Sequence, residues 1–305
     1  MRLLKIGSKG DDVKQLQKVL GLKADGIFGP LTKKAVKKYQ LQNDLVVDGI
    51  VGKNTWQLMQ VVKLTNDAID EDSDINAQYY NTMFGSTIHK YYLSKDEYLQ
   101  KRGKNEYLFL HHTAGGANPY ACIDYWNRDS RGRVATEFVI GGQDCRNGND
   151  EYDGSVLQAF PDDGYGWHLG KTGSGHMNRH SVGIEICSMG YLTEDYKTYV
   201  GKIADESQVR KLNEPFRGRR FWHKYSVKQV EELEKLIKYI AERDGINVRV
   251  GLKQWINKYG VTRAFEFQED AYYGKVKGLL SHTNVRKGKM DIYPDPLIIE
   301  MIMSL

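Results

Sequence analysis

A run of four large apolar residues, Tyr107 to Leu110, ends in His111 and His112 and is followed by a glycine-containing loop. An uninterrupted apolar run of this length predicts a short buried strand. An imidazole at the end of a rigid strand is well placed to bind a metal ion that faces a cleft. Two histidines at a strand end are also common without any metal, so the pair alone leaves both interpretations open.

A second cluster lies far downstream, where His282 follows the apolar residues Leu279 and Leu280. Asp291 comes nine residues after that histidine. Two histidines and one carboxylate, with a fourth position left for water, are the ligand set of a catalytic zinc site. The two clusters together therefore favour a metal centre over two unrelated strand ends.

The chain has 305 residues, which is enough for one full hydrophobic core and more typical of two domains. Its formal net charge of +5 is small and suits an anionic polymer such as a bacterial cell wall, although nucleic acid is equally anionic. No basic stripe with interleaved aromatic residues stands out, so we expect no nucleic-acid partner.

The N-terminal residues Met1–Gly7 contain no apolar core of signal-peptide length, and no segment of the chain approaches a membrane span. We therefore expect a chain that is made in the cytoplasm, does not insert into a membrane, and reaches any external substrate through another factor. Three cysteines without a CxxC spacing fit a reduced compartment, and a Cys122–Cys145 disulfide is the open alternative.

Residues 1–62 have the apolar periodicity of a small helical domain. Within it, residues 24–32 contain an Asp-Gly turn, an apolar pair, a glycine and a threonine, and this pattern returns 23 residues later in residues 47–55. Residues 3–59 resemble the three-helix peptidoglycan-binding domain found on many cell-wall hydrolases. The resemblance implies a small all-α domain that holds the protein at a polymeric substrate.

Residues 63–102 begin with an acidic stretch that has few large apolar side chains, which predicts a solvated linker and a connecting segment. Strand and helix patterns alternate from residue 103 onward, and the clearest helix spans residues 226–243 behind a capping serine. We therefore expect an α/β domain over residues 103–305, with a mixed central sheet flanked by helices. Residues 244–278 are either a wall over the cleft or, more simply, a surface insertion, and we assign no function to them.

Five motifs follow one another in this second domain: His111–Gly115, Glu137–Ile140, Trp167–Gly170, Ser181–Glu185, and His282 followed by Lys289 and Asp291. In this order they resemble the zinc-dependent N-acetylmuramoyl-L-alanine amidases of the phage T7 lysozyme and peptidoglycan-recognition-protein class. One such motif would be weak evidence, but five in the order of the family are specific.

The resemblance implies a Zn²⁺ ion bound by His111, His282 and Asp291 and completed by a water molecule. The choice of His111 over His112 comes from the family alone. Asp295 precedes a proline, as the ligand of the family often does, and is therefore a rival third ligand. The spacing from His282 and from Lys289 favours Asp291.

Two further residues match catalytic positions of the family. Glu185 lies in a strand pattern among valine, isoleucine and glycine, where a lone carboxylate is costly unless it is paired or functional. The resemblance implies that it is the general base, and a solvent-facing glutamate is the alternative. Lys289 matches the lysine that neutralises the developing oxyanion, and a surface lysine in a basic loop is the alternative.

Four residues are candidates for substrate binding: His112, Glu137, Trp167 and His168. The family commonly has a histidine or tyrosine near position 137, and this chain has neither there. Glu137 therefore either shares the role of general base or is structural. His168 either holds substrate or packs against Trp167.

We expect a peptidoglycan hydrolase that cleaves the amide between N-acetylmuramic acid and the L-alanine of the stem peptide. The domain order is similar to that of a phage endolysin, and we expect a monomer that acts on the bacterial cell wall. Two alternatives are a metal-free peptidoglycan-recognition protein and a zinc peptidase that cuts within the stem peptide.

Overall fold

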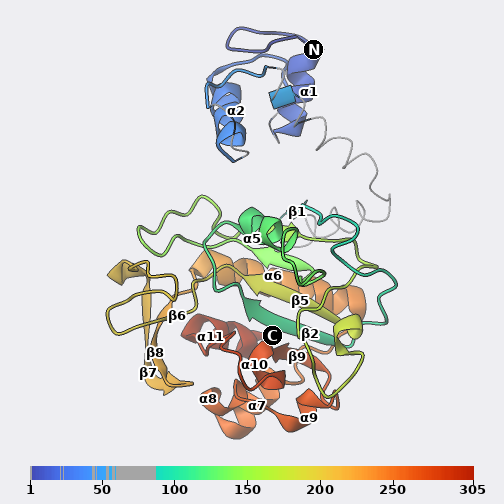
Figure 1. Cartoon of the computed structure of the whole chain (residues 1–305), viewed down its shortest axis with the longest axis vertical. Helices are drawn as coiled ribbons and strands as arrows, with labels where there is room; N and C mark the ends of the chain where they lie inside the picture. Colours follow the sequence, from blue (N-terminus) through green and yellow to red (C-terminus); the bar gives the residue numbers. More distant parts are fainter. Residues whose placement is uncertain are drawn as a thin grey trace. The chain divides into compact units, whose positions relative to one another are not determined.

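The computed structural model describes residues 2–59, except residues 21, 23, 43, 44, 46, 53, 54, 57 and 58, and residues 87–305. The chain divides into two compact units, Met1–Asp72 and Ser73–Leu305 (Figure 1). Most of the predicted linker, residues 63–86, lies outside the described residues. Each unit is considered separately below.

The N-terminal unit contains helices α1 (Asp11–Val19) and α2 (Pro30–Gln42). Their apolar faces share a core with residues from the flanking turns, and Leu16, Phe28, Val36 and Trp56 are among its buried members. The helical character predicted for this unit is confirmed for these two elements. The third helix implied by the resemblance falls largely outside the described residues.

The repeated turn of the N-terminal unit is built around two equivalent glutamines. The side chain of Gln17 donates to Asp25 at 2.7 Å and accepts from the backbone N–H of Gly26 at 2.8 Å. Gln40 donates to Asp48 at 2.8 Å and accepts from the next glycine at 2.8 Å, so each partner lies 23 residues further along. The sequence repeat therefore reflects a repeated hydrogen-bond arrangement.

The second unit is organised around a six-stranded sheet with the order β1-β4-β3-β5-β2-β9. All neighbouring strands are parallel except β3 and β4, so the predicted mixed sheet is confirmed. The strands are β1 (Ile88–Lys90), β2 (Tyr107–His112), β3 (Phe138–Ile140), β4 (Val156–Gln158), β5 (Ser181–Ile186) and β9 (Gly278–Ser281). Because β1 pairs with β4, the chain enters this sheet ahead of residue 103, the domain start that the sequence pattern predicts.

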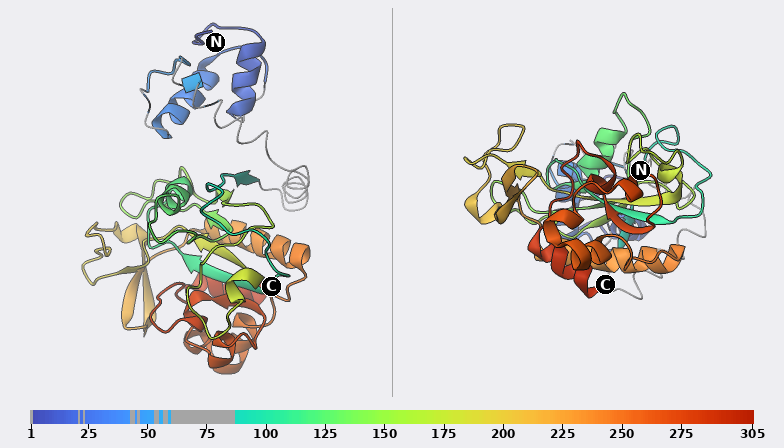
Figure 2. Two further views of the ribbon diagram at one scale, coloured as in Figure 1. Left: turned by 45° about the vertical axis from the view of Figure 1, so that its right-hand side comes forward. Right: turned by 90° about the horizontal axis from the view of Figure 1, so that it is seen from below.

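Helices cover both faces of the sheet. Phe138 and Ile140 of β3 pack in one core with Leu233 of helix α6 (Val227–Asp244), whereas Val139 packs in another core with Ile123 of helix α5 (Pro119–Trp126). Alternate residues of a strand point to opposite faces, so α5 and α6 lie on opposite sides (Figure 2). The predicted helix at 226–243 is confirmed, with Ser226 capping its first turn.

The C-terminal third adds short helices around β9: α7 (Leu252–Tyr259), α8 (Val261–Ala264), α9 (Glu269–Tyr272), α10 (His282–Val285) and α11 (Pro296–Ser304). Residues 244–278 include buried core members such as Leu252 and Phe265. This segment is therefore part of the main core rather than a surface insertion. Its burial is not evident from sequence because each helix is too short to show a clear period.

A three-stranded antiparallel sheet, which the sequence did not lead us to expect, follows β5. It contains β6 (Tyr191–Leu192), β7 (Val209–Phe216) and β8 (Arg219–His223) in the order β6-β8-β7. Short 3₁₀ turns occur at Met177–His180 (η1) and Glu206–Gln208 (η2).

Cys122, Cys145 and Cys187 are free thiols in the structure. Among the described helices, none has the length and apolarity needed to cross a membrane.

Candidate metal centre

Two adjacent parallel strands bring His111 and His282 to one edge of the sheet. β2 and β9 are paired with Leu110 opposite Ser281, so the next residue on each strand is a histidine. The carboxyl ends of parallel strands meet at the same edge, which is where ligand sites of such sheets form. The strand-end histidines predicted from sequence therefore lie side by side, and both are buried.

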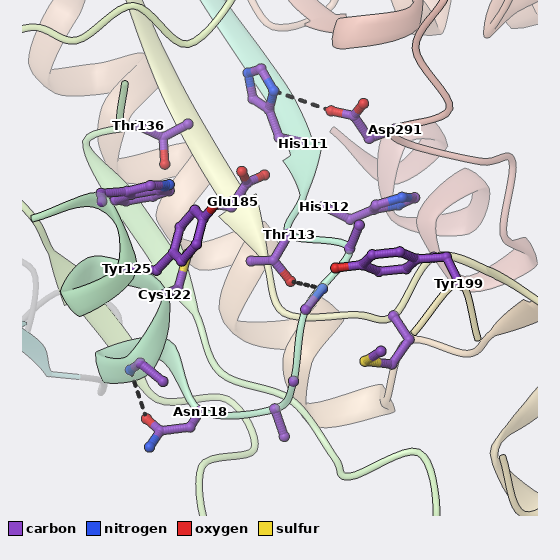
Figure 3. A pocket seen from close by; sticks show the side chains of 18 of the residues that line it. His111, His112, Thr113, Asn118, Cys122, Tyr125, Thr136, Glu185, Tyr199 and Asp291 are labelled. Atoms are coloured by element: carbon purple, nitrogen blue, oxygen red, sulfur yellow. Dashed lines mark hydrogen bonds and ion pairs between the residues drawn. The ribbon is translucent and has the colours of Figure 1, made fainter. Parts of the chain in front are cut away.

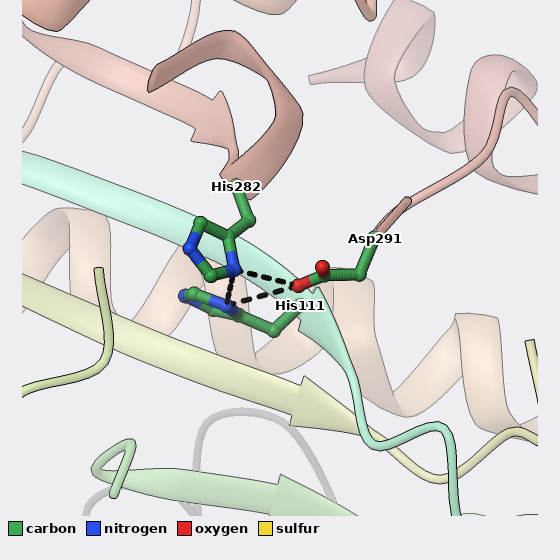
Figure 4. A group of neighbouring side chains, drawn as sticks. All are labelled: His111, His282 and Asp291. Carbon is green, nitrogen blue, oxygen red and sulfur yellow. Dashed lines mark hydrogen bonds and ion pairs between the residues drawn. The ribbon is translucent and has the colours of Figure 1, made fainter. Parts of the chain in front are cut away.

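The carboxylate of Asp291 completes a compact group with the two imidazoles (Figure 4). Its Oδ2 lies 2.8 Å from His282 Nδ1 and 3.3 Å from His111 Nδ1, and the two Nδ1 atoms are 3.0 Å apart. Three lone-pair-bearing atoms at this mutual spacing can each point at one cation, and two imidazoles with a carboxylate suit Zn²⁺. The residues present therefore fit a zinc ion.

The electrostatics of this group favour the protonation states that a metal requires. Burial, together with the charge on His282, lowers the pKa of His111 to about 4. Burial alone would raise the pKa of Asp291, but its contacts with His282 and His111 hold that pKa well below its usual range. His111 is therefore neutral and Asp291 is ionised at neutral pH, as metal ligands must be.

The loop that carries Asp291 is held by an arginine that sequence analysis missed. Arg217, in the turn between β7 and β8, donates to the carbonyl oxygens of Thr283 at 3.2 Å and Lys287 at 3.0 Å, and also to that of Lys289. The N–H of Thr283 donates to the carbonyl of Asp291 at 3.0 Å. No sequence motif marks Arg217, because the carbonyl oxygens that it holds in this loop lie about 70 residues away.

Asp295, the rival ligand, points elsewhere and is fully buried. Its Oδ1 accepts from the N–H of Leu297 and so caps α11, while its Oδ2 accepts from Tyr293 at 2.9 Å and from Arg210 at 3.0 Å. Both oxygens are therefore engaged in structural contacts. The structure brings Asp291, and not Asp295, to the two histidines.

Glu185 lies beside the histidine group on the neighbouring strand β5, in register with His111. Its Oε2 atom is buried and has no hydrogen-bond partner among the described residues. Burial and the Asp291 carboxylate raise the pKa of Glu185 well above its usual value, and the positive charge of Lys289 opposes this shift. A carboxylate that has a raised pKa and lies beside a candidate metal site has the properties of a general base.

A cavity of about 940 Å³ opens over these residues. His111, His282, Asp291 and Glu185 line it, together with His112, His168 and the exposed Lys289. Two tyrosines that sequence analysis did not single out, Tyr125 of α5 and Tyr199 of the loop after β6, flank the cavity from different sides (Figure 3). They are 60% and 58% exposed, so both rings can meet a ligand.

Two of the substrate-binding candidates are absent from the residues that line this cavity. Trp167 is 42% exposed elsewhere, where its ring contacts Tyr165. Glu137 is fully buried and pairs with Arg243 at 2.8 Å and with Arg102. The contacts of Glu137 support the structural alternative over a share in the general-base role.

Replacing Glu137 with glutamine is expected to lower the free energy of unfolding by about 3 kcal/mol, because two arginines lose the charge that compensates them in the core. The affinity for zinc should not change. Denaturant titration and a zinc competition assay on the same variant measure the two quantities. Loss of zinc binding at unchanged stability would instead place Glu137 in the functional site.

Comparison with known families assigns both parts of the chain. Residues 101–258 match the family described as N-acetylmuramoyl-L-alanine amidase, and residues 9–59 match the family described as a peptidoglycan-binding domain. A curated relative, N-acetylmuramoyl-L-alanine amidase CwlA of Bacillus subtilis (strain 168), is 32% identical over 84 residues. That match covers 28% of this chain and 26% of the relative, so the chain spans about a quarter of its length.

Solved structures that match part of this chain include PlyL, at 14% identity and a TM-score of 0.38, covering 67% of this chain and 85% of that one. Another is the N-acetylmuramyl-L-alanine amidase AmiD from E. coli in complex with the substrate anhydro-N-acetylmuramic acid-L-Ala-D-gamma-Glu-L-Lys. It is 19% identical, with a TM-score of 0.30, and the match covers 48% of this chain and 47% of AmiD.

Proposed function

The chain belongs to the N-acetylmuramoyl-L-alanine amidase family, and we propose that it hydrolyses the amide between N-acetylmuramic acid and the L-alanine of the peptidoglycan stem peptide. The observation that carries this proposal is the convergence of His111, His282 and Asp291 at the floor of a cavity, with the unpaired carboxylate of Glu185 beside them. Amide hydrolysis needs an activated water and a group that moves its proton, and this arrangement can supply both.

His111, His282 and Asp291, which all line the cavity, would hold the Zn²⁺ ion. A zinc ion bound there lowers the pKa of a water molecule and polarises the carbonyl of the amide. Burial keeps the imidazole of His111 neutral, and contacts with His111 and His282 keep the carboxylate of Asp291 ionised. These two groups would therefore bind the ion without first losing a proton.

Glu185 would accept the proton of the attacking water on its free Oε2 atom and later deliver it to the departing amine. No described hydrogen bond engages that atom, and Glu185 is one of the residues that line the cavity. Lys289 lines the same cavity and carries a positive charge that can stabilise negative charge developing on the carbonyl oxygen. His112 lines the cavity as well and is a candidate for substrate contact.

The N-terminal unit would act as a three-helix module that binds peptidoglycan and keeps the catalytic unit near its polymeric substrate. The match of residues 9–59 to a peptidoglycan-binding family supports this role. Tethering raises the effective concentration of the enzyme at the wall without changing the chemistry of the active site.

The proposal is tested by identifying the bond that is cut. Purified peptidoglycan is incubated with the zinc-loaded protein, and the new amino termini on the released fragments are identified. New L-alanine amino termini on intact stems are expected. New termini inside the stem would show that the protein is a peptidase and not an amidase. Wall binding without new termini would favour a recognition protein.

A further inference from the structure

His168 lies directly behind His111, on the side away from the other proposed ligands. Its Nδ1 is 2.9 Å from His111 Nε2, while His111 Nδ1 faces His282 and Asp291. Its own Nε2 is 2.8 Å from the hydroxyl of Ser181, the first residue of β5. His168 is buried, and both of its ring nitrogens are engaged by protein groups. The side chain is therefore tied to the metal centre rather than free to hold substrate.

The last hydrogen bond in this series determines which atom donates in each of the others. The Ser181 hydroxyl donates to the backbone carbonyl of Asn178, which can only accept. Its oxygen is then free to accept from Nε2–H of His168, so Nδ1 of His168 carries a lone pair. That lone pair accepts from Nε2–H of His111, and Nδ1 of His111 is left unprotonated.

The placement of the His111 proton on Nε2 matters because Asp291 favours the opposite tautomer. With its Oδ2 only 3.3 Å from His111 Nδ1, the carboxylate would attract a proton to that nitrogen. A proton there would have to be displaced before a metal could bind, because ligating histidines must present a lone pair. The acceptor on His168 holds the proton at Nε2 and keeps Nδ1 available.

The neighbouring strands leave room for the ring of His168. Gly183 of β5 lies against the ring, and a Cβ atom at that position would come within 2.8 Å of His168 Nδ1 and 2.7 Å of the Thr136 methyl. The edge of the ring also meets Phe109 of β2, with centroids 5.9 Å apart. Packing by β2 and β5 therefore limits the positions that the imidazole can take.

We propose that His168, backed by Ser181, is a positioning residue that fixes His111 in the tautomer required for binding zinc. The inference rests on the proposed zinc-dependent function. Ligating histidines commonly donate their second nitrogen to such a partner, and loss of the partner typically weakens metal affinity about 10–100-fold. Here the partner is itself a histidine whose tautomer is set by a third group.

Two substitutions of similar size separate the positioning role from simple packing. The Oδ1 of asparagine can occupy the place of Nδ1, so His168→Asn keeps an acceptor for His111. The polar end of glutamine reaches only the place of Nε2, so His168→Gln contacts Ser181 but leaves His111 without an acceptor. His176→Asn changes an exposed histidine outside the centre and serves as the control.

The first measurement uses ¹⁵N-labelled histidine in the zinc-free full-length protein, where ring nitrogen shifts report the tautomer. We expect His111 to carry its proton on Nε2 in the wild type and in His168→Asn, and on Nδ1 in His168→Gln. The second measurement is zinc affinity by competition with a chelator. We expect His168→Gln to lose about 10–100-fold in affinity, with near-wild-type values for His168→Asn and His176→Asn.

Equal zinc affinities and tautomers in wild type and His168→Gln would overturn the proposal, as would equal losses in the asparagine and glutamine variants. Ser181→Ala supplies a second route if a His168 variant does not fold, and a loss of affinity in the same direction is expected for it. A wild type with the Nε2–H tautomer that binds no zinc would retain the tautomer assignment but refute the zinc-dependent function.

Discussion

Replacing Asp291 with asparagine is expected to leave the protein without stoichiometric zinc and to reduce wall lysis on the order of 10³-fold or more. The substitution keeps the shape of the side chain but removes the charge that faces His111 and His282. Without the metal, water in the cavity returns to its ordinary pKa, far above the value near 7 that a bound zinc confers. Metal analysis after gel filtration and a turbidity assay on purified walls measure the two effects.

Asp295→Asn is the matched control for this experiment, since the two aspartates are close in sequence and both are buried. It removes the charged partner of Arg210 and should cost about 1–3 kcal/mol of stability. Zinc content should stay at the wild-type level. If Asp295→Asn lost the metal while Asp291→Asn retained it, the proposed ligand set would be wrong.

Replacing Glu185 with glutamine is expected to lower kcat about 10²–10⁴-fold, which is the usual contribution of a general base, while zinc content stays unchanged. Glutamine has nearly the same size and cannot accept the proton of water. Steady-state kinetics on a soluble muropeptide, with metal analysis of the same preparation, separate this result from that of Asp291→Asn. Loss of zinc from Glu185→Gln would show that the carboxylate supports the metal centre instead.

The raised pKa of Glu185 also predicts how activity changes on the acid side of the pH profile. Burial and the Asp291 carboxylate raise the pKa of Glu185, so the base becomes protonated at a higher pH than an ordinary glutamate would. Activity of the wild type should therefore fall as the pH drops through this raised value. In Glu185→Gln, the residual rate should lack that limb. An unchanged acid limb in the variant would assign the ionisation to another group.

Local patterns located the two strand ends that carry the candidate metal ligands, whereas the choice of His111 over His112 came from the resemblance to the family. His111 and His282 each end an apolar run, and strands of that kind pair inside a sheet with their carboxyl ends at one edge. The helix from Ser226 was predictable for a similar reason, since its cap and apolar stripe lie within one segment. The monomeric state and the similarity to a phage endolysin stay predictions.

Other features of the centre could not be read from neighbouring residues. His168 and Glu137 both lie in motifs of the family, yet one backs His111 and the other pairs with arginines in the core. Tyr199 and Arg217 belong to no recognisable motif. They lie in loops beside the strands of the small sheet, and from there Tyr199 lines the cavity and Arg217 contacts the Asp291 loop.

The sequence by itself determined the family, the two-part organisation and the residue types of the candidate centre, because these depend on motifs and their order along the chain. The tertiary structure decided which of two aspartates meets the histidines, which carboxylate remains unpaired, and which group holds the second nitrogen of His111. Those choices depend on distances of about 3 Å between side chains far apart in sequence. Spacing along the chain cannot specify such distances, because loops such as the one tied by Arg217 take their course from contacts with distant strands.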